Sequence, residues 1–345
     1  MQLISEKLNL PVGFFLEPCE DTVKRIFFRS LASTTKSART RASRRLAWLQ
    51  RISRYVREYF DIPALNLPAL DLPRNPLEIS EQQIEDAAAK CRELFSLGQA
   101  PIADLIAVLE NNGIVVSRGL LDAENMDAFC EWDDDIPYIF LGADKTSAAR
   151  SRMDAAHELG HLILHRFVEP QQLRTPGFHK LLEQQAFRFG SAFLMPSSWL
   201  KELWAPTLDA FLALKARWRV SIAAMISRSE DLGVVNADQA QRLWINYNRR
   251  QWRKNEPLDD KLIPEEPRIV KRCLELLLED RTKTRDQILL DLNLNSRDVE
   301  QLAGLSSGFL SSAHGDVFVM PRSRQERPAG GAAGVVVPFG APHKQ

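Results

Sequence analysis

Residues 155–167 of the 345-residue chain read AAHELGHLILHRF and contain the pattern HExxH at His157, Glu158 and His161. In an α-helix, side chains four residues apart project from one face, one turn apart, so the two imidazoles can bind one metal ion. Zinc in such a site lowers the pKa of a bound water to about 7, and Glu158 is placed to accept the proton that this water releases. The pattern therefore predicts a Zn²⁺ site with His157 and His161 as ligands and Glu158 as the catalytic base.

Two further residues of this stretch, Gly160 and His165, are each expected to have a specific role. Gly160 costs helix propensity, roughly 1 kcal/mol relative to Ala, so we expect another element to pack closely against it. His165 lies one more turn along the same face. A third ligand in such sites usually comes from another element, so we expect His165 to orient a ligand or to cap the helix rather than to bind the metal.

The third ligand is sought downstream, where Glu169, His179, Glu183 and Glu202 are candidates. Glu183 lies in LLEQQAFRFGSAFLMP (181–196), whose apolar residues have helical spacing. A helix packed antiparallel across the HExxH helix would bring one carboxylate to the metal. Among the acidic residues from 170 to 201, Glu183 alone lies inside that helix, and it is the favoured ligand.

Composition limits the class of protein. The chain has 45 basic and 45 acidic residues and is 45% hydrophobic, as in soluble globular proteins. It has no apolar run long enough to span a membrane and no evident signal peptide. The four cysteines form no CxxC pair, which favours reduced thiols in the cytoplasm. They are Cys19, Cys91, Cys130 and Cys273.

The charges are unevenly distributed. Eleven Lys and Arg residues and no acid lie between Lys24 and Arg57, and seven acids lie between Asp122 and Asp135. The basic stretch could contact phosphates, or it could be a helix face packed on an acidic part of the same chain. We favour the second reading because no aromatic residues are interleaved with the basic ones in the manner of a base-stacking surface.

The remaining pattern predicts an α+β fold that is mostly helical. An amphipathic helix is expected over 38–60, a helix capped by Ser80 through Phe95, and a helix opened by Pro101. Short β-branched and aromatic runs predict a small antiparallel sheet, and helices are expected from 147 to about 250 and over 265–303. The strand runs are 113–119, 127–132 and 137–142.

Five regions follow from these patterns. We expect a helical N-terminal segment, a proline-rich linker, a zinc peptidase domain with a zincin-like HExxH helix, a helical C-terminal region and a disordered tail rich in Gly, Pro and Ala. Their boundaries are 1–60, 61–78, 79–232, 233–320 and 321–345.

HELGHLILH followed by EQQAFRFGSAFLMP resembles the ImmA/IrrE family of metallo-endopeptidases. The resemblance implies His157, His161 and Glu183 as zinc ligands and Glu158 as the general base. Phe187 and Gly190 depart from the family pattern, and we interpret both as packing variants. LISEKLNLPVGFF (3–15) resembles only the last helix of the helix-turn-helix domain that precedes the peptidase in longer, regulator-like members. We therefore do not expect this chain alone to bind operator DNA.

The resemblance covers roughly residues 1–305 and implies a function. It implies a zinc-dependent endopeptidase that cleaves a cytoplasmic protein, in particular a helix-turn-helix repressor, in a stress, mobile-element or toxin–antitoxin response. The alternative is a transcriptional regulator or sensor that uses the zinc fold without proteolysis. An oxyanion donor is also expected, with Tyr138 and Arg152 as candidates, and no membrane partner is expected.

Overall fold

The computed structural model describes residues 1–8, 10–16, 26–28, 35–121, 126–143, 147–169 and 171–311. Met1–Ser311 make up one compact unit. The predicted tail 321–345 and Cys19 lie outside the described residues. The predicted boundaries between regions stay predictions. None of the helices in the described ranges has the length and apolar character needed to cross a membrane.

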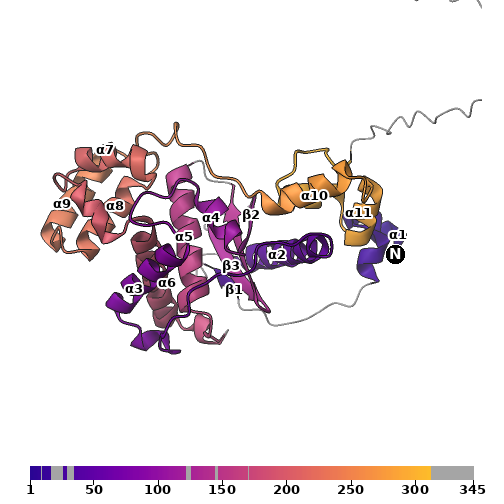
Figure 1. Ribbon diagram of the computed structural model, residues 1–345, viewed down its shortest axis with the longest axis horizontal. Helices are drawn as coiled ribbons and strands as arrows, with labels where there is room; N and C mark the ends of the chain where they lie inside the picture. The colour runs from indigo at the N-terminus through magenta and orange to yellow at the C-terminus, as the bar shows by residue number, and fades with distance from the viewer. Residues whose placement is uncertain are drawn as a thin grey trace, which may run out of the picture. The chain divides into compact units, whose positions relative to one another are not determined.

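The described chain is mostly helical with one small sheet, which is the predicted fold class (Figure 1). The α-helices of the first part of the chain are α1 (Gln2–Leu8), α2 (Lys36–Arg57), α3 (Glu81–Leu94), α4 (Leu105–Asn111), α5 (Ala148–Leu164) and α6 (Pro176–Leu194). Those that follow are α7 (Leu208–Trp218), α8 (Ile222–Asp231), α9 (Ala237–Arg249), α10 (Ile269–Glu279), α11 (Arg285–Leu292) and α12 (Ser296–Ala303). Short 3₁₀ helices cover Val12–Phe15, Pro76–Glu78, Gln172–Arg174 and Ser197–Lys201.

The sheet is mixed rather than antiparallel throughout. Its strand order is β1-β3-β4-β2. The strands are β1 (Ile26–Phe28), β2 (Val115–Gly119), β3 (Ala128–Asp133) and β4 (Ile136–Gly142). The β1–β3 and β3–β4 pairs are antiparallel, but β2 and β4 are parallel, so the prediction of an antiparallel sheet is wrong for that pair. The β3–β4 hairpin reverses the chain, so β4 runs in the direction of β2 and lies beside it.

The interior contains two hydrophobic cores, one on each face of the sheet, because the side chains of a strand alternate between the two faces. On β4, Ile139 and Leu141 face the core that contains α5 and α6, whereas Tyr138 and Phe140 face the core that contains α2 and α10–α12. Successive side chains of a strand point to opposite faces, so one sheet serves both cores. Figure 1 shows the sheet with α5 and α6 on one side and α2 on the other.

Capping explains where two predicted helices begin. The Ser80 side chain accepts from the backbone N–H of Gln83 at 3.3 Å and forms a capping box, which confirms the predicted start of α3. The helix expected to open at Pro101 begins instead at Leu105. Asp104 accepts from the backbone N–H of Ala107 at 3.0 Å, and this cap fixes the start of α4.

The basic helix α2 packs on the sheet. Arg54 lies 2.9 Å from the Asp133 carboxylate, and the Gln50 amide donates to Glu131 at 3.2 Å. The reading of this helix as packed on an acidic part of the same chain is therefore confirmed for Arg54.

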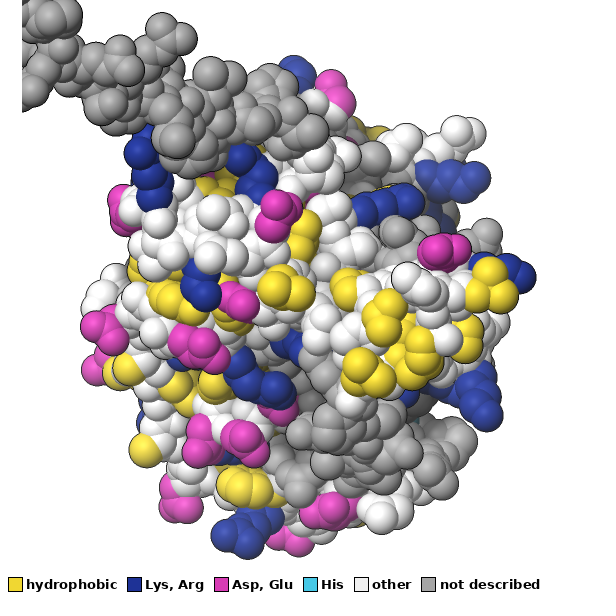
Figure 2. All heavy atoms as spheres, turned by 90° about the vertical axis from the view of Figure 1, so that its right-hand side faces the viewer, with side chains coloured by type: hydrophobic (Ala, Val, Ile, Leu, Met, Phe, Trp, Pro, Cys, Tyr) yellow, Lys and Arg dark blue, Asp and Glu magenta, His cyan; other side chains and the backbone are white. Residues whose placement is uncertain are grey.

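The short helix α1 leaves its apolar side chains at the surface. Leu3, Ile4 and Leu8 are all largely exposed. Figure 2 views the side of the molecule on which α1 and α11 lie and shows hydrophobic side chains at that surface.

Candidate metal centre

Helix α5 holds the HExxH residues in the interior of the protein. It begins after Ser147, whose hydroxyl accepts from the backbone N–H of Arg150 at 3.4 Å. His157, Glu158 and His161 are each no more than 2% exposed. The sequence prediction that these residues share one helix is confirmed, and the structure places that helix in the interior.

Helix α6 crosses α5 in the antiparallel sense at a point where two glycines permit close approach. A Cβ built on Gly160 would lie 3.0 Å from the carbonyl oxygen of Ala186, and one built on Gly190 would lie 2.9 Å from the amide nitrogen of His157. The close packing expected at Gly160 is therefore present. The departure at Gly190 is a packing feature, as interpreted, and it lies directly against the backbone of a predicted ligand.

The crossing brings two imidazoles and a carboxylate together. The Nε2 atoms of His157 and His161 are 3.0 Å apart, and they lie 3.3 Å and 3.2 Å from the two carboxylate oxygens of Glu183. One donor atom from each residue lies within 4.8 Å of the others. This His-His-Glu cluster is the donor set of catalytic zinc sites, which leave a fourth position open for water or substrate.

The charge state of Glu183 also suits a cation. Burial alone would raise the pKa of Glu183, but the adjacent imidazoles of His157 and His161 outweigh it and hold the pKa well below its usual range. The carboxylate is therefore ionised at neutral pH. Two nitrogen donors and one anionic oxygen converge here, so the residues present fit a divalent metal ion.

A hydrogen-bond chain behind the cluster sets the tautomer of His161. The Gln185 amide nitrogen donates to the carbonyl of Pro76 at 2.8 Å, which leaves its Oε1 to accept from His165 Nε2 at 3.0 Å. Burial holds the pKa of His165 well below its usual value, so that ring is neutral and its Nδ1 is an acceptor. His161 Nδ1, 2.9 Å away, must then donate, and the lone pair on Nε2 faces the cluster.

Sequence reasoning identified His165 but missed the rest of this chain. His165 does not join the cluster; it ends α5 and contacts His161 from behind. Gln185 and Pro76 carry no recognisable motif in the sequence. The only indication in the sequence is position, because Gln185 lies two residues beyond Glu183 in the same helix. In the structure its side chain is buried, with 5% of the residue exposed. A buried amide so near a ligand needs a partner.

Glu158 lies on the sheet side of α5, next to β3. The Cys130 thiol of β3 lies close enough to interact electrostatically with the Glu158 carboxylate. Burial raises the pKa of Cys130 well above its usual value, and the Glu158 and Glu183 carboxylates raise it further. The thiol is therefore protonated, and it is influenced by both carboxylates of the site. Cys91, Cys130 and Cys273 are all free and buried.

A surface groove of about 660 Å³ reaches the cluster and is called here the metal groove. His157 and Glu183 line it together with Phe187 and Ser227. His179 lies beside the cluster, with Nε2 3.6 Å from Glu183. Phe187 is therefore more than a packing variant, because its ring forms part of the groove surface.

The other predicted candidates are engaged elsewhere. Glu169 is exposed, and Glu202 accepts from the Trp218 indole at 3.1 Å. Tyr138 is buried in the second core, on the α2 side of the sheet. Arg152 donates to Glu265 and to the carbonyl of Ile102. None of them belongs to the cluster, so the expected oxyanion roles of Tyr138 and Arg152 are not supported by their positions.

Comparison with known proteins agrees with this geometry. Residues 109–230 match the Peptidase_M78 family model, which describes an IrrE N-terminal-like domain. No curated protein matches the chain. The match runs from the end of α4 to the end of α8 and includes His157, His161 and Glu183, whereas α1–α3 and α9–α12 lie outside it. Residues 109–230 are therefore similar to the IrrE N-terminal-like domain of the Peptidase_M78 family, which supports a metallopeptidase-type function with a possible metal site at His157, His161 and Glu183.

Proposed function

We propose that this protein is a zinc-dependent endopeptidase with His157, His161 and Glu183 as metal ligands and Glu158 as general base. The observation that carries the proposal is the cluster itself. Two imidazole nitrogens and an ionised carboxylate converge within 4.8 Å at the end of a groove about 660 Å³ in volume. Zinc bound there would lower the pKa of a water to about 7 and polarise the scissile carbonyl.

The chain's own residues account for the remaining steps. The metal groove holds the peptide so that its scissile carbonyl lies at the cluster. Glu158 takes a proton from the attacking water as the water oxygen bonds to the carbonyl carbon. As the C–N bond breaks, Glu158 passes that proton to the leaving amine nitrogen. The hydrogen-bond chain through His165 and Gln185 keeps His161 oriented throughout.

The natural substrate is proposed from the resemblance alone. It is a cytoplasmic protein, in particular a helix-turn-helix repressor whose cleavage would switch on stress, mobile-element or toxin–antitoxin genes.

Metal content and cleavage can be measured on the same preparations. The protein is purified without chelators, supplied with zinc, and analysed by mass spectrometry for metal and for cleavage of a peptide mixture from a digested proteome. About one zinc per chain is expected, with loss in His161→Ala. Glu158→Gln should retain zinc and lose cleavage, because it keeps the ligands but removes the base.

Two results would count against the proposal. Retention of zinc by His161→Ala would show that the metal lies elsewhere. Identical peptide products from the zinc-loaded protein and Glu158→Gln would remove the base from the mechanism. The regulator without proteolysis would then be the better reading.

A further inference from the structure

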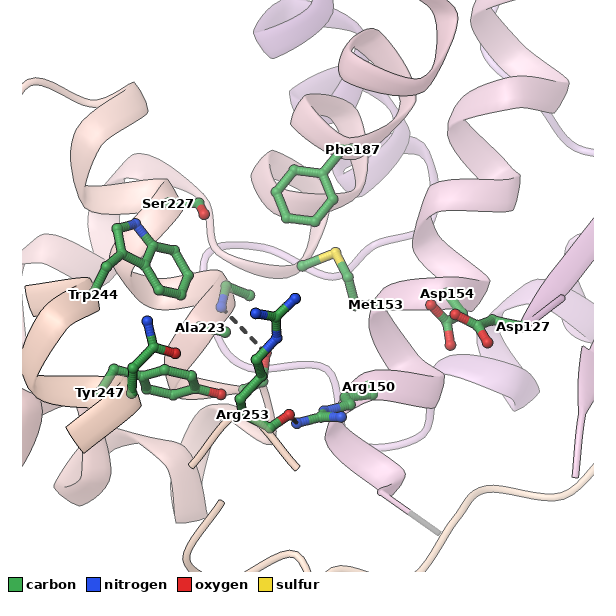
Figure 3. A pocket seen from close by; sticks show the side chains of 13 residues that line it. Asp127, Arg150, Met153, Asp154, Phe187, Ala223, Ser227, Trp244, Tyr247 and Arg253 are labelled. Atoms are coloured by element: carbon green, nitrogen blue, oxygen red, sulfur yellow. Dashed lines mark hydrogen bonds between the residues drawn. The ribbon is translucent and has the colours of Figure 1, made fainter. Parts of the chain in front are cut away.

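A second pocket of about 510 Å³ lies next to the metal groove. It is called here the aromatic pocket, because Phe187, Trp244, Tyr247 and Met153 form much of its surface. Figure 3 shows the Phe187, Trp244 and Tyr247 rings and the Met153 thioether around one hollow, with the Arg253 guanidinium between Met153 and Tyr247. Phe187 and Ser227 line both the pocket and the groove, so the two are contiguous.

Helix geometry places the pocket one turn from the metal ligands. Met153 precedes His157 by four residues on α5, and Phe187 follows Glu183 by four residues on α6. Both residues therefore lie on the ligand-bearing faces, about 6 Å along each helix axis. Because α5 and α6 are antiparallel, the step from His157 back to Met153 and the step from Glu183 on to Phe187 point in the same direction. An extended peptide advances roughly 3.3 Å per residue, so this distance corresponds to about two residues of substrate.

The polar groups of the pocket are balanced in charge. Arg150 and Arg253 are offset by Asp127 and Asp154. The Arg150 guanidinium donates to the carbonyl of Arg253 at 2.7 Å. Figure 3 shows Asp127 and Asp154 together, away from the aromatic rings. The part of the pocket bounded by the rings therefore offers aromatic faces and one guanidinium, a combination that suits an aromatic guest on which the guanidinium can stack.

The far side of the pocket is held in shape by contacts of α9 and of Glu256, which lie outside the matched family segment. Trp244 and Tyr247 make an edge-to-face contact with ring centroids 5.5 Å apart, and the Tyr247 hydroxyl donates to the buried Glu256 carboxylate at 2.9 Å. Glu256 also accepts from Lys215 at 2.8 Å. A pocket already held in shape loses little conformational freedom when a guest enters.

We propose that the aromatic pocket binds a bulky apolar side chain of the substrate, of the aromatic class, within about two residues of the scissile bond. This inference rests on the proposed peptidase function and deepens it by naming what the site selects. Aromatic and thioether groups supply most of the contact area for a ring, and the Arg253 guanidinium can stack on its face.

Two hydroxamic acids test the pocket without requiring turnover. Acetohydroxamic acid contacts the metal alone, whereas 3-phenylpropanohydroxamic acid also carries a ring at about the distance of the pocket. Their dissociation constants for the zinc-loaded full chain are measured by calorimetry. The phenyl compound should bind about ten- to a hundred-fold more tightly, the gain expected from burying one phenyl ring.

Three variants assign that gain to the pocket. Trp244→Ala removes part of the surface, and Ala223→Leu fills the space from α8, so both should abolish the advantage of the phenyl compound while acetohydroxamic acid binds unchanged. Trp204→Ala is the matched control, because Trp204 is 74% exposed and does not line the pocket. It should keep the full advantage.

The possible failures are distinct. If acetohydroxamic acid binds but the ring adds nothing, or if its advantage survives in both pocket variants, the pocket assignment is overturned and the metal site stands. If the protein takes up no zinc, or the loaded protein binds neither compound, the proposed function and the pocket assignment fall together.

Discussion

The backbone of Gly190 lies so close to His157 that a Cβ at residue 190 would come within 2.9 Å of the His157 amide nitrogen. Real Cβ atoms essentially never approach backbone this closely, so something must shift when one is added. The residue on the other side of this contact is a proposed metal ligand, and the stability of the crossing and the affinity of the site should therefore change together.

We expect Gly190→Ala to lower the free energy of unfolding by about 1–3 kcal/mol, the range for overpacked interiors. It should also weaken zinc binding, because α5 and α6 must separate at His157. Urea unfolding and chelator competition measure the two effects.

Gly177→Ala provides the control in the same helix. A Cβ at Gly177 would meet nothing within 4 Å. Better helix propensity should leave that variant unchanged or more stable, by up to about 1 kcal/mol. A Gly190→Ala protein as stable as its parent, with equal zinc affinity, would contradict the role assigned to the crossing.

The chain from Pro76 through Gln185 and His165 predicts a loss of metal affinity at a distance. Gln185→Leu keeps the approximate volume but removes both the donor to Pro76 and the acceptor for His165 Nε2. With the tautomer of His161 no longer fixed, zinc affinity should fall by about ten- to a hundred-fold, as for other partners of metal-binding histidines.

Gln184→Leu is the matched control because Gln184 is the exposed neighbour on α6. It should bind zinc as the parent does. Equal affinity for the parent and Gln185→Leu would show that the chain does not orient the ligand.

A buried ion network joins α7 to residues beyond α9 and is expected to dominate the stability of this region. Lys215 is fully buried and lies 2.8 Å from Glu256 and 2.7 Å from Asp259. Lys215→Met would leave two carboxylates without their cation in the interior. We expect it to cost about 3–5 kcal/mol in denaturant unfolding.

The exposed pair Arg250–Asp209 offers a comparison, since Arg250 is 41% and Asp209 72% exposed. Arg250→Met should leave the unfolding midpoint unchanged. A Lys215→Met protein that unfolds at the same midpoint would refute the importance of the network.

Glu110 gives the stability a defined dependence on pH. Burial raises the pKa of Glu110 from its ordinary 4.5 to about 7, although the backbone N–H groups of Arg268 and Ile269 donate to its carboxylate. The folded protein therefore keeps a proton that the unfolded chain releases. The contribution of Glu110 to the free energy of unfolding should fall as the pH rises from about 4.5 to about 7, by up to about 3 kcal/mol.

Glu110→Gln removes this titration. The stability of Glu110→Gln relative to the parent should increase by about 3 kcal/mol between roughly pH 5 and pH 8, measured by urea unfolding at both values. A difference that stays constant over this interval would mean that Glu110 titrates normally.

Local signals in the sequence located the residues of the His-His-Glu cluster. HExxH on one helix and Glu183 on the next depend on helical spacing, which a single sequence reveals, and Gly160 indicated the close crossing. The parallel pairing of β2 with β4 could not be read because periodicity gives the face of a strand but not its neighbour. The aromatic pocket could not be read either, since Trp244 and Tyr247 reach it only through packing between helices distant in sequence.

The two parts of the site lie in different stretches of the chain, so they are synthesised and can fold at different times. The proposed ligands come from α5 and α6, which are consecutive helices, whereas the aromatic pocket also needs α8, α9 and Arg253. Contacts between neighbouring helices close short loops, so they form at a smaller entropic cost than contacts between distant segments. During synthesis the proposed metal ligands can therefore come together before α9 and Arg253 complete the proposed pocket, and a newly made chain would gain its metal site before its selectivity.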